Sequence, residues 1–341
     1  MRVLITGAAG FIGSHAARHV LGLPGWEVLG LDSLVRGHWR AVRALEGVGG
    51  PRFQFAQVDV RDEAAVTQAC AGFQPEAVLH FAALARVEES MADPQAYWNT
   101  NVDGTAALLA AMRACGVPRL VFSSSAAVYG APAVVPVDES APTLPVNPYG
   151  ETKLAGERLI AEEVRARALA RNEPLARSVP LGAVCLRYFN VAGAASDGLL
   201  GEDHDPETHL VPSALLAAAG RRSALELFGT DYPTSDGTCV RDFVHVEDLA
   251  AAHTAVLPLA QPGAFRVFNV GLGRGFSVRQ VIDACSRVAG RAVPVVERPR
   301  RAGDPPVLVA ACHALHQAVD WTPRHTTLEC MATPAWRWLT R

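Results

Sequence analysis

The first half of the chain alternates short apolar runs with segments of helical periodicity. The apolar runs are nearly continuous, which is typical of parallel strands buried on both faces. They predict strands at Arg2–Thr6, Trp26–Asp32, Arg52–Asp59, Ala77–Ala83, Arg119–Ser124 and Ala183–Val191. Helices are expected between several of them, at Ile12–Leu23, Glu63–Ala71 and Asn101–Ala114. This βαβ series predicts an α/β fold of the Rossmann type, with a doubly wound parallel sheet.

The pattern changes after Ala192, where glycine, proline and aspartate interrupt the chain and the elements become short. We therefore expect two domains: a Rossmann domain over residues 1–190 and a smaller C-terminal α/β lobe for the substrate over residues 191–341. Val240–Ala252 resumes a strand-then-helix pattern, which allows this segment to return to the first domain. Arg165–Pro180 is polar and contains Pro174, so it is expected to form an exposed connection.

Composition narrows the possible partners. The chain has 31 basic and 34 acidic residues, a net charge of −3. It therefore lacks the basic surface that nucleic acid or an anionic membrane would require. No apolar stretch reaches the length of a membrane span, and no signal peptide is expected before the first strand. Seven scattered cysteines indicate reduced thiols, so we expect a cytoplasmic protein.

A glycine-rich turn follows the first predicted strand directly. It comprises Gly7, Gly10 and Gly13, with Phe11 and Ile12 opening the helix. Small residues there let the backbone approach a pyrophosphate, and the helix N-terminus offers N–H donors. Asp32 ends the second strand, 19 residues beyond Gly13. Its carboxylate can accept from a ribose diol and would repel a 2′-phosphate, so the pattern predicts NAD rather than NADP.

The only lysine among the basic residues, Lys153, lies four residues after Tyr149. On a helix these two side chains share one face. A neighbouring ammonium is expected to lower the pKa of the tyrosine, as is the positive nicotinamide of bound NAD, so that Tyr149 can remove a hydroxyl proton. Ser123, Ser124 and Ser125 end the fifth predicted strand, where open α/β sheets bind ligands. We favour Ser125 as the third catalytic residue, and the other two serines stay open.

These motifs, together with Leu186–Asn190, resemble those of the extended short-chain dehydrogenases. More narrowly, the chain is similar to the UDP-galactose (UDP-glucose) 4-epimerases over essentially its whole length. Two stretches carry the narrower resemblance: Gly229–Asp242, and Pro299–Asp304 with the sequence PRRAGD. The resemblance implies that Tyr149 takes the proton of the hexose 4-hydroxyl while carbon 4 gives a hydride to tightly held NAD. The 4-keto sugar then turns over, and the hydride returns to its other face.

The family's site residues can be carried over one position at a time. The resemblance implies cofactor contacts at Asp59, Val60, Phe81, Ala82, Leu84, Asn101, Ser123, Tyr149, Lys153 and Tyr188. It implies contacts with the UDP-sugar substrate at Ser125, Tyr149, Asn190, Leu210, Leu225, Phe228, Arg241, Arg301, Asp304 and Leu308. It also implies a homodimer that packs through the helices around Thr105–Arg113 and Gly150–Ile160.

Three features depart from the family pattern. Ala85 and Arg86 stand where many relatives carry a lysine or a hydroxyl residue that contacts the cofactor. The connection between Lys153 and Tyr188 is longer than usual. Leu308 is intermediate between the tyrosine and the small residue found in relatives, so acceptance of N-acetylated sugars is open.

Other functions were weighed against this interpretation. A 4,6-dehydratase is disfavoured because Ala126 and Ala127 replace the Asp-Glu pair that elimination of water needs. Epimerases or decarboxylases acting on UDP-N-acetylglucosamine, a UDP-pentose or UDP-glucuronate stay open, as does, more remotely, a redox-inactive NAD-binding regulator. No metal site is expected, since His204, His209, His313, His316 and His325 show no metal-ligand spacing. Trp321, Trp336 and Trp338 are expected to pack a terminal helix.

Overall fold

The computed structural model describes residues 1–170, 179–301 and 303–341. Contacts divide the chain into two compact units. The first comprises Met1–Gly130, Thr143–Arg187 and Ala250–Phe268, and the second comprises Ala131–Pro142, Tyr188–Leu249 and Asn269–Arg341. The chain thus crosses between the units several times. The sequence pattern suggested a boundary near residue 190 and allowed a return at Val240–Ala252, of which Ala250–Ala252 lies in the first unit.

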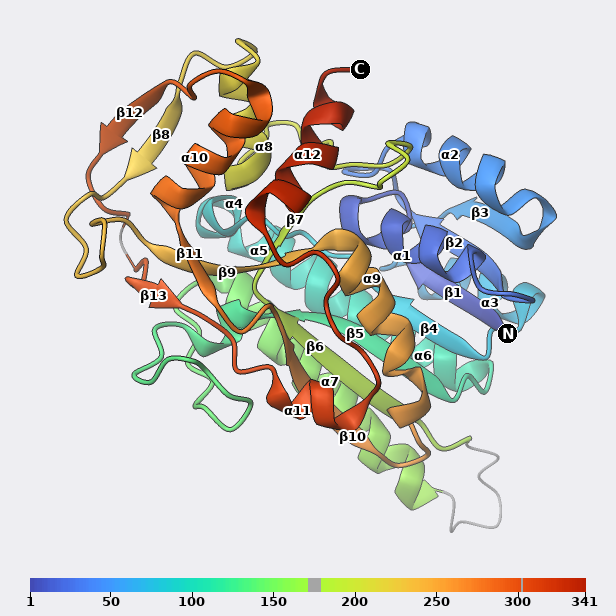
Figure 1. Ribbon diagram of the computed structural model, residues 1–341. Coiled ribbons are helices and arrows are strands. Elements are labelled where there is room, and N and C mark those ends of the chain that lie inside the picture. The colour runs from blue at the N-terminus through green and yellow to red at the C-terminus, as the bar shows by residue number, and fades with distance from the viewer. Residues whose placement is uncertain (171–178, 302) are drawn as a thin grey trace. The chain divides into compact units, whose positions relative to one another are not determined.

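A seven-stranded sheet forms the centre of the first unit (Figure 1). Its strand order is β10-β6-β5-β4-β1-β2-β3. The chain starts at β1 inside the sheet, continues through β2 to the edge strand β3, and then returns to β4 on the other side of β1. The pairings of β1 with β2 and β4, of β2 with β3 and of β4 with β5 are parallel. The strands are β1 (Arg2–Thr6), β2 (Glu27–Asp32), β3 (Phe53–Gln57), β4 (Ala77–His80), β5 (Arg119–Ser125), β6 (Gly182–Tyr188) and β10 (Phe265–Val270). This order is that of a Rossmann sheet with one added strand, as the sequence predicts.

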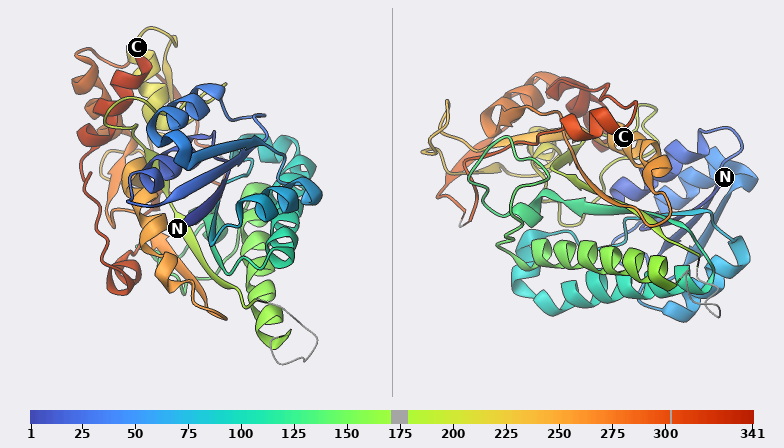
Figure 2. Two further views of the ribbon diagram at one scale, coloured as in Figure 1. Left: turned by 90° about the vertical axis from the view of Figure 1, so that its right-hand side faces the viewer. Right: turned by 90° about the horizontal axis from the view of Figure 1, so that it is seen from below.

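Helices join these strands. They are α1 (Phe11–Leu21), α2 (Trp39–Gly49), α3 (Glu63–Phe73), α4 (Val87–Ala92), α5 (Pro94–Tyr97), α6 (Gly104–Ala114), α7 (Pro148–Ala170) and α9 (Val246–Ala255), which crosses from the second unit to the first. Short 3₁₀ turns occur at η1 (Gly50–Arg52), η3 (Ala126–Tyr129) and η4 (Leu257–Leu259), and a π-helical turn, η2 (Trp98–Asp103), precedes α6. Figure 2 shows α6 and α7 running side by side, and the two helices contact one another.

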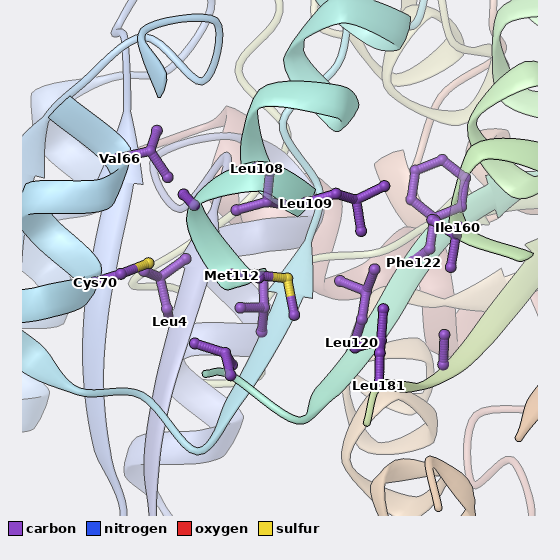
Figure 3. Close-up of a cluster of buried hydrophobic side chains, with 14 of the residues drawn as sticks. Leu4, Val66, Cys70, Leu108, Leu109, Met112, Leu120, Phe122, Ile160 and Leu181 are labelled. Atoms are coloured by element: carbon purple, nitrogen blue, oxygen red, sulfur yellow. The ribbon is translucent and has the colours of Figure 1, made fainter. Parts of the chain in front are cut away.

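The core of the first unit lies between α3, α6 and the sheet. Leu4, Leu120 and Phe122 from the strands meet Leu108 and Met112 from α6 (Figure 3). Val66 and Cys70 from α3, Ile160 from α7 and Leu181 complete this cluster. Burial of these apolar surfaces drives the pairing of helices and sheet.

The second unit contains two smaller sheets. In one, β9 (Val240–His245) pairs with β7 (Asn190–Ala192), β11 (Gly275–Ser277) and β13 (Val307–Leu308). In the other, β8 (Leu225–Phe228) pairs with β12 (Val295–Arg298). The helices α8 (Leu210–Ala218), α10 (Val278–Ala289) and α12 (Leu328–Leu339) pack on one another around Leu215, Val281 and Met331, and α11 (His313–Ala318) is short.

Three expectations need correction. The strand expected at Ala183–Val191 is two strands: it ends at Tyr188 and resumes as β7, which pairs with β9 of the second unit. The strand expected at Ala77–Ala83 ends at His80, because the chain there turns to pass against Gly7. The exposed connection expected at Arg165–Pro180 is wrong for its first residues, since α7 continues to Ala170 and Arg167 is buried; residues 171–178 lie outside the described residues.

The part of the chain that the structure describes contains no helix long and apolar enough to cross a membrane. All seven cysteines are free thiols, and Cys330 alone among them is exposed. Of the three C-terminal tryptophans, Trp336 and Trp338 lie on α12. Trp321 precedes that helix and donates its indole N–H to the carbonyl of Asp248.

Candidate active site

The glycine-rich turn after β1 is shaped by close backbone contacts. Gly7 has φ +71°, a conformation that side chains rarely adopt. A Cβ at Gly7 would lie 2.7 Å from the nitrogen of Ala82, and one at Gly13 would lie 2.1 Å from the carbonyl oxygen of Gly7. Gly10, the N-cap of α1, has no side chain that could cap the first-turn N–H groups. The turn therefore offers the cradle and the helix N-terminus that a dinucleotide pyrophosphate requires.

Asp32 is held beside this turn by two backbone hydrogen bonds. Its carboxylate accepts from the N–H of Ala9 at 2.9 Å and from the N–H of Leu34 at 2.8 Å. Burial raises the pKa of Asp32, and these two N–H groups partly oppose that rise. The carboxylate thus has a fixed place at the end of β2, which fits recognition of a ribose diol.

The other residues expected at the cofactor have distinct surroundings. Asp59 is partly exposed and forms an ion pair with Arg61, whereas Val60 is buried in the core of the first unit. Asn101 is buried, and its side chain bonds both the N–H and the C=O of Leu84 as well as the hydroxyl of Thr152. Asn101 therefore ties the loop after β4 to α7. Tyr188, the last residue of β6, is buried.

The segment at Ala85 and Arg86 departs from the family pattern, and its backbone is fixed by a tyrosine. The hydroxyl of Tyr97 donates to the carbonyl of Arg86 at 2.6 Å and accepts from its N–H at 2.8 Å. Tyr97 is fully buried, and its ring meets that of Tyr149 edge-on at 6.4 Å. This loop is thereby connected to the residue proposed as the base.

The three residues proposed for proton transfer come from β5 and the first turns of α7. Tyr149 and Lys153 are both buried on α7, at 9% and 4% exposure. The hydroxyl groups of Tyr149 and Ser125 are hydrogen-bonded. Lys153 donates from Nζ to the carbonyl oxygen of Ser123 at 2.8 Å, while Ser124 donates to Glu157. Each of the three serines therefore has a different partner, and Ser125 is the one bonded to Tyr149.

The electrostatics of the pair differ from the sequence expectation. Burial raises the pKa of Tyr149, and the hydrogen bond to Ser125 opposes this only in part. The Nζ of Lys153 lies 5.9 Å from the centre of the Tyr149 ring and is bonded elsewhere. The protein groups alone therefore raise this pKa, and the expected lowering requires the charge of the bound nicotinamide as well. Burial outweighs a charge at that distance.

Burial also shifts the pKa of Lys153, and this shift predicts a pH dependence of the free energy of unfolding. Burial lowers the pKa of Lys153 from its usual 10.5 to about 8, although Glu157 opposes that shift. Between these two values the unfolded chain binds a proton that the folded chain does not, so the stability rises with pH. Below about pH 8 the buried ammonium therefore lowers the free energy of unfolding by about 3 kcal/mol, and we expect Lys153→Met to remove this cost.

The measurement is urea unfolding of wild type and Lys153→Met at pH 7.5 and 10.5. Methionine also loses the bond to Ser123, but that loss is similar at both pH values. The free energy of unfolding of the variant minus that of wild type should therefore be about 3 kcal/mol larger at pH 7.5 than at pH 10.5. An equal difference in the free energy of unfolding at both pH values would contradict the lowered pKa.

Behind Lys153 lies a buried ion pair that the sequence analysis did not identify. Glu157 and Arg187 form two bonds, Nε to Oε1 at 2.9 Å and Nη2 to Oε2 at 2.6 Å. Both side chains are less than a tenth exposed, and Arg187 also donates to the hydroxyl of Tyr129. The available signal was the spacing, because Glu157 follows Lys153 by four residues on the same face of α7.

Residues expected at the UDP group form two clusters within the second unit. Arg241 lies 3.4 Å from Asp304, and Leu308 pairs with Arg241 in register between β13 and β9. The guanidinium of Arg301 stacks 3.9 Å above the ring of Phe228, at the end of β8. Leu225 is buried in the core of this unit and Leu210 packs against it, whereas Asn190 is exposed on β7.

The chain is similar to known proteins over nearly its whole length. Residues 3–271 match the model of the NAD dependent epimerase/dehydratase family. The chain is 42% identical over 339 residues to the UDP-glucose 4-epimerase of Lacticaseibacillus casei, covering 99% of this chain and 96% of that protein.

Solved structures are similar over the full length. The UDP-glucose 4-epimerase of Stenotrophomonas maltophila, solved with NAD and formylated UDP-arabinopyranose, superposes with a TM-score of 0.91 at 39% identity. That of Bifidobacterium longum, solved with NAD⁺ and UDP, gives a TM-score of 0.90 at 36% identity. Each comparison covers 100% of this chain and 98% of the other.

Proposed function

The chain belongs to the NAD-dependent epimerase/dehydratase family, and we propose that it interconverts UDP-glucose and UDP-galactose at carbon 4 of the sugar. The observation that carries the proposal is the buried arrangement of Ser125, Tyr149 and Lys153, in the same unit as the Gly7 turn and Asp32. It joins a proton acceptor to a dinucleotide site, which is what reversible oxidation of an alcohol requires.

The protein groups handle the proton of the sugar hydroxyl. Tyr149 accepts this proton at its phenolic oxygen and later returns it. Ser125 fixes the orientation of that oxygen through their hydrogen bond. Lys153 bonds the carbonyl of Ser123, so its positive charge stays near the tyrosine ring. Since burial raises the pKa of Tyr149, a further positive charge is needed to favour the phenolate.

The cofactor is NAD. When bound, NAD would supply reversible hydride exchange at carbon 4 and, on its nicotinamide, the positive charge that favours a phenolate. Gly7, Gly10 and Gly13 hold the pyrophosphate and Asp32 the adenosine ribose. Asp59, Val60, Phe81, Ala82, Leu84 and Tyr188 are proposed to line the rest of its site.

The second unit is proposed to bind the uridine diphosphate. Arg241 and Arg301 supply positive charge for the two phosphates, and Asp304 can accept from a ribose hydroxyl. Stacking on Phe228 fixes the plane of the Arg301 guanidinium, which lowers the entropy lost when it binds an anion. Asn190, Leu210, Leu225 and Leu308 are proposed to complete this set.

We also propose that the protein is a homodimer that packs through α6 and α7. The side-by-side arrangement of these helices supports this, as does the exposed apolar surface at Met91 and Trp98 on the neighbouring turns. Light scattering after gel filtration tests the proposal, because a dimer has twice the chain mass of 36.2 kDa.

The activity is tested by incubating purified protein with UDP-galactose and measuring UDP-glucose with a coupled dehydrogenase. Turnover without added NAD supports both the reaction and a retained cofactor, and turnover only after NAD is added supports the reaction alone. Inactivity with NAD bound would overturn the choice of substrate. The same assay on UDP-N-acetylglucosamine, UDP-glucuronate and a UDP-pentose would then identify the sugar.

A further inference from the structure

Four side chains of metal-ligating type converge in one short segment of the second unit. They are Glu202, His204, Glu207 and His209, called here the 202–209 cluster. One nitrogen or carboxylate oxygen from each lies within 4.8 Å of all the others. We infer that this cluster binds one divalent transition-metal ion of the zinc type, a role separate from the proposed epimerase reaction.

The four donor atoms lie close to one another. The Nδ1 of His204 lies 3.1 Å from Oε1 of Glu202 and 3.9 Å from Oε2 of Glu207. The Nδ1 of His209 also hydrogen-bonds Oε1 of Glu202. Zinc holds nitrogen and oxygen ligands at roughly 2.0–2.2 Å, so tetrahedral ligands stand about 3.4 Å apart. Donors within 4.8 Å of one another reach that geometry through shifts of about 1 Å.

The backbone around the cluster is fixed at both ends. The carbonyl of Glu202 accepts the indole N–H of Trp338, which belongs to α12. At the other end, Oε1 of Glu207 accepts the N–H groups of Thr208 and His209, both at 2.7 Å, which leaves Oε2 toward His204. Ligands held in this way lose little entropy when a metal binds.

The donor set indicates the class of metal. Two imidazole nitrogens and two carboxylate oxygens suit zinc and its neighbours in the transition series, whereas calcium and magnesium prefer six or more oxygens. A dication also balances the charges of Glu202 and Glu207. The side chains of Glu202 and Glu207 are 4% and 8% exposed, whereas those of His204 and His209 are 28% and 44% exposed, so the ion would balance two largely buried carboxylates at a site whose histidines reach solvent.

A second group of possible ligands in the same unit is less suitable. It contains three residues, His245, Glu247 and His325. Nδ1 of His245 already accepts the N–H of Glu247 at 3.1 Å. Its other ring nitrogen lies against Gly193, where a Cβ would stand 2.4 Å away. The 202–209 cluster offers four donors rather than three.

A metal here would act on the chain next to α8. His209 directly precedes Leu210, the first residue of that helix. Bridging Glu202 and His209 would therefore fix the loop that ends at Leu210, one of the residues proposed at the UDP group. The inferred role is structural.

The test uses the full-length protein, stripped with a chelator and titrated with Zn²⁺ by calorimetry. We expect one equivalent to bind, and Co²⁺ in its place to give the visible absorption of a tetrahedral site. The variant His204→Ala/His209→Ala should lose at least about 100-fold in zinc affinity. Glu207→Gln keeps an oxygen acceptor for the two N–H groups and should still weaken binding by roughly 10-fold or more.

A matched control removes two histidines elsewhere. His313 and His316 are exposed and three apart on α11, and His313→Ala/His316→Ala should bind zinc as wild type does. Zinc should also raise the Tm of wild type by a few degrees and leave that of the His204→Ala/His209→Ala variant unchanged. No binding by wild type, or binding lost only in His313→Ala/His316→Ala or His325→Ala, would overturn the inference.

Discussion

Replacing Tyr149 by phenylalanine is expected to lower kcat for UDP-galactose by roughly 10²–10⁴-fold. The substitution keeps the buried ring and removes only the hydroxyl that bonds Ser125 and exchanges the sugar proton. Binding of the UDP group should be little affected, since Arg241 and Arg301 are untouched. KM should therefore change by no more than a few-fold, and bound NAD should be retained. The measurement is steady-state kinetics with the coupled assay, with cofactor content checked by absorbance.

Tyr97→Phe is the matched control. Tyr97 is also buried, its ring contacts that of Tyr149, and its hydroxyl bonds the backbone of Arg86. Its loss should reduce stability by about 1 kcal/mol and kcat by no more than a few-fold. If Tyr149→Phe kept more than a tenth of wild-type kcat, the proton would have to pass through another group.

Replacing Glu157 by leucine is expected to lower the free energy of unfolding by about 3–5 kcal/mol. The substitution leaves the guanidinium of Arg187 buried without its carboxylate partner, and it removes the acceptor of the Ser124 hydroxyl. Desolvation of an uncompensated charge is the dominant cost. Urea unfolding followed by circular dichroism measures the change.

Two further variants separate the pair from its neighbours. Glu157→Leu combined with Arg187→Met removes both charges and should recover most of the loss, because an apolar pair needs no compensation. Glu226→Gln breaks the Arg298–Glu226 pair, whose side chains are 49% and 45% exposed, and should cost less than about 1 kcal/mol. If the loss of stability in the double variant equalled the losses of Glu157→Leu and Arg187→Met added together, the pair would not be the source of the effect.

Much of the first unit could be predicted because most of its strands are largely buried and therefore apolar. Continuous apolar runs predicted β1, β2, β3 and β5 to within two residues at either end. Errors arose where long-range contacts decide the boundary. β4 ends at His80 because the following chain passes against Gly7, and Phe189 separates two strands that belong to different sheets. Neither the approach to Gly7 nor the change of sheet at Phe189 can be inferred from the local sequence.

The proposed site shows the same division. Tyr149, Lys153 and the glycine turn have short, regular spacings, so sequence reasoning could find them. The ion pair of Glu157 with Arg187 joins residues 30 apart, and only the fold shows that both are buried. The 202–209 cluster could not be predicted from the histidines alone, because two of its four members are the glutamates Glu202 and Glu207. The spacing Glu-x-His-x-x-Glu-x-His contained the signal.

The burial of the only lysine has a practical consequence for covalent chemistry. Acylating and carbonyl reagents that attack amines can find only the α-amino group and the Nζ of Lys153 on this chain. The α-amino group is accessible, whereas Lys153 is 4% exposed. A second adduct per chain would therefore lie on Lys153 and would show that the proposed catalytic centre has become open to the reagent.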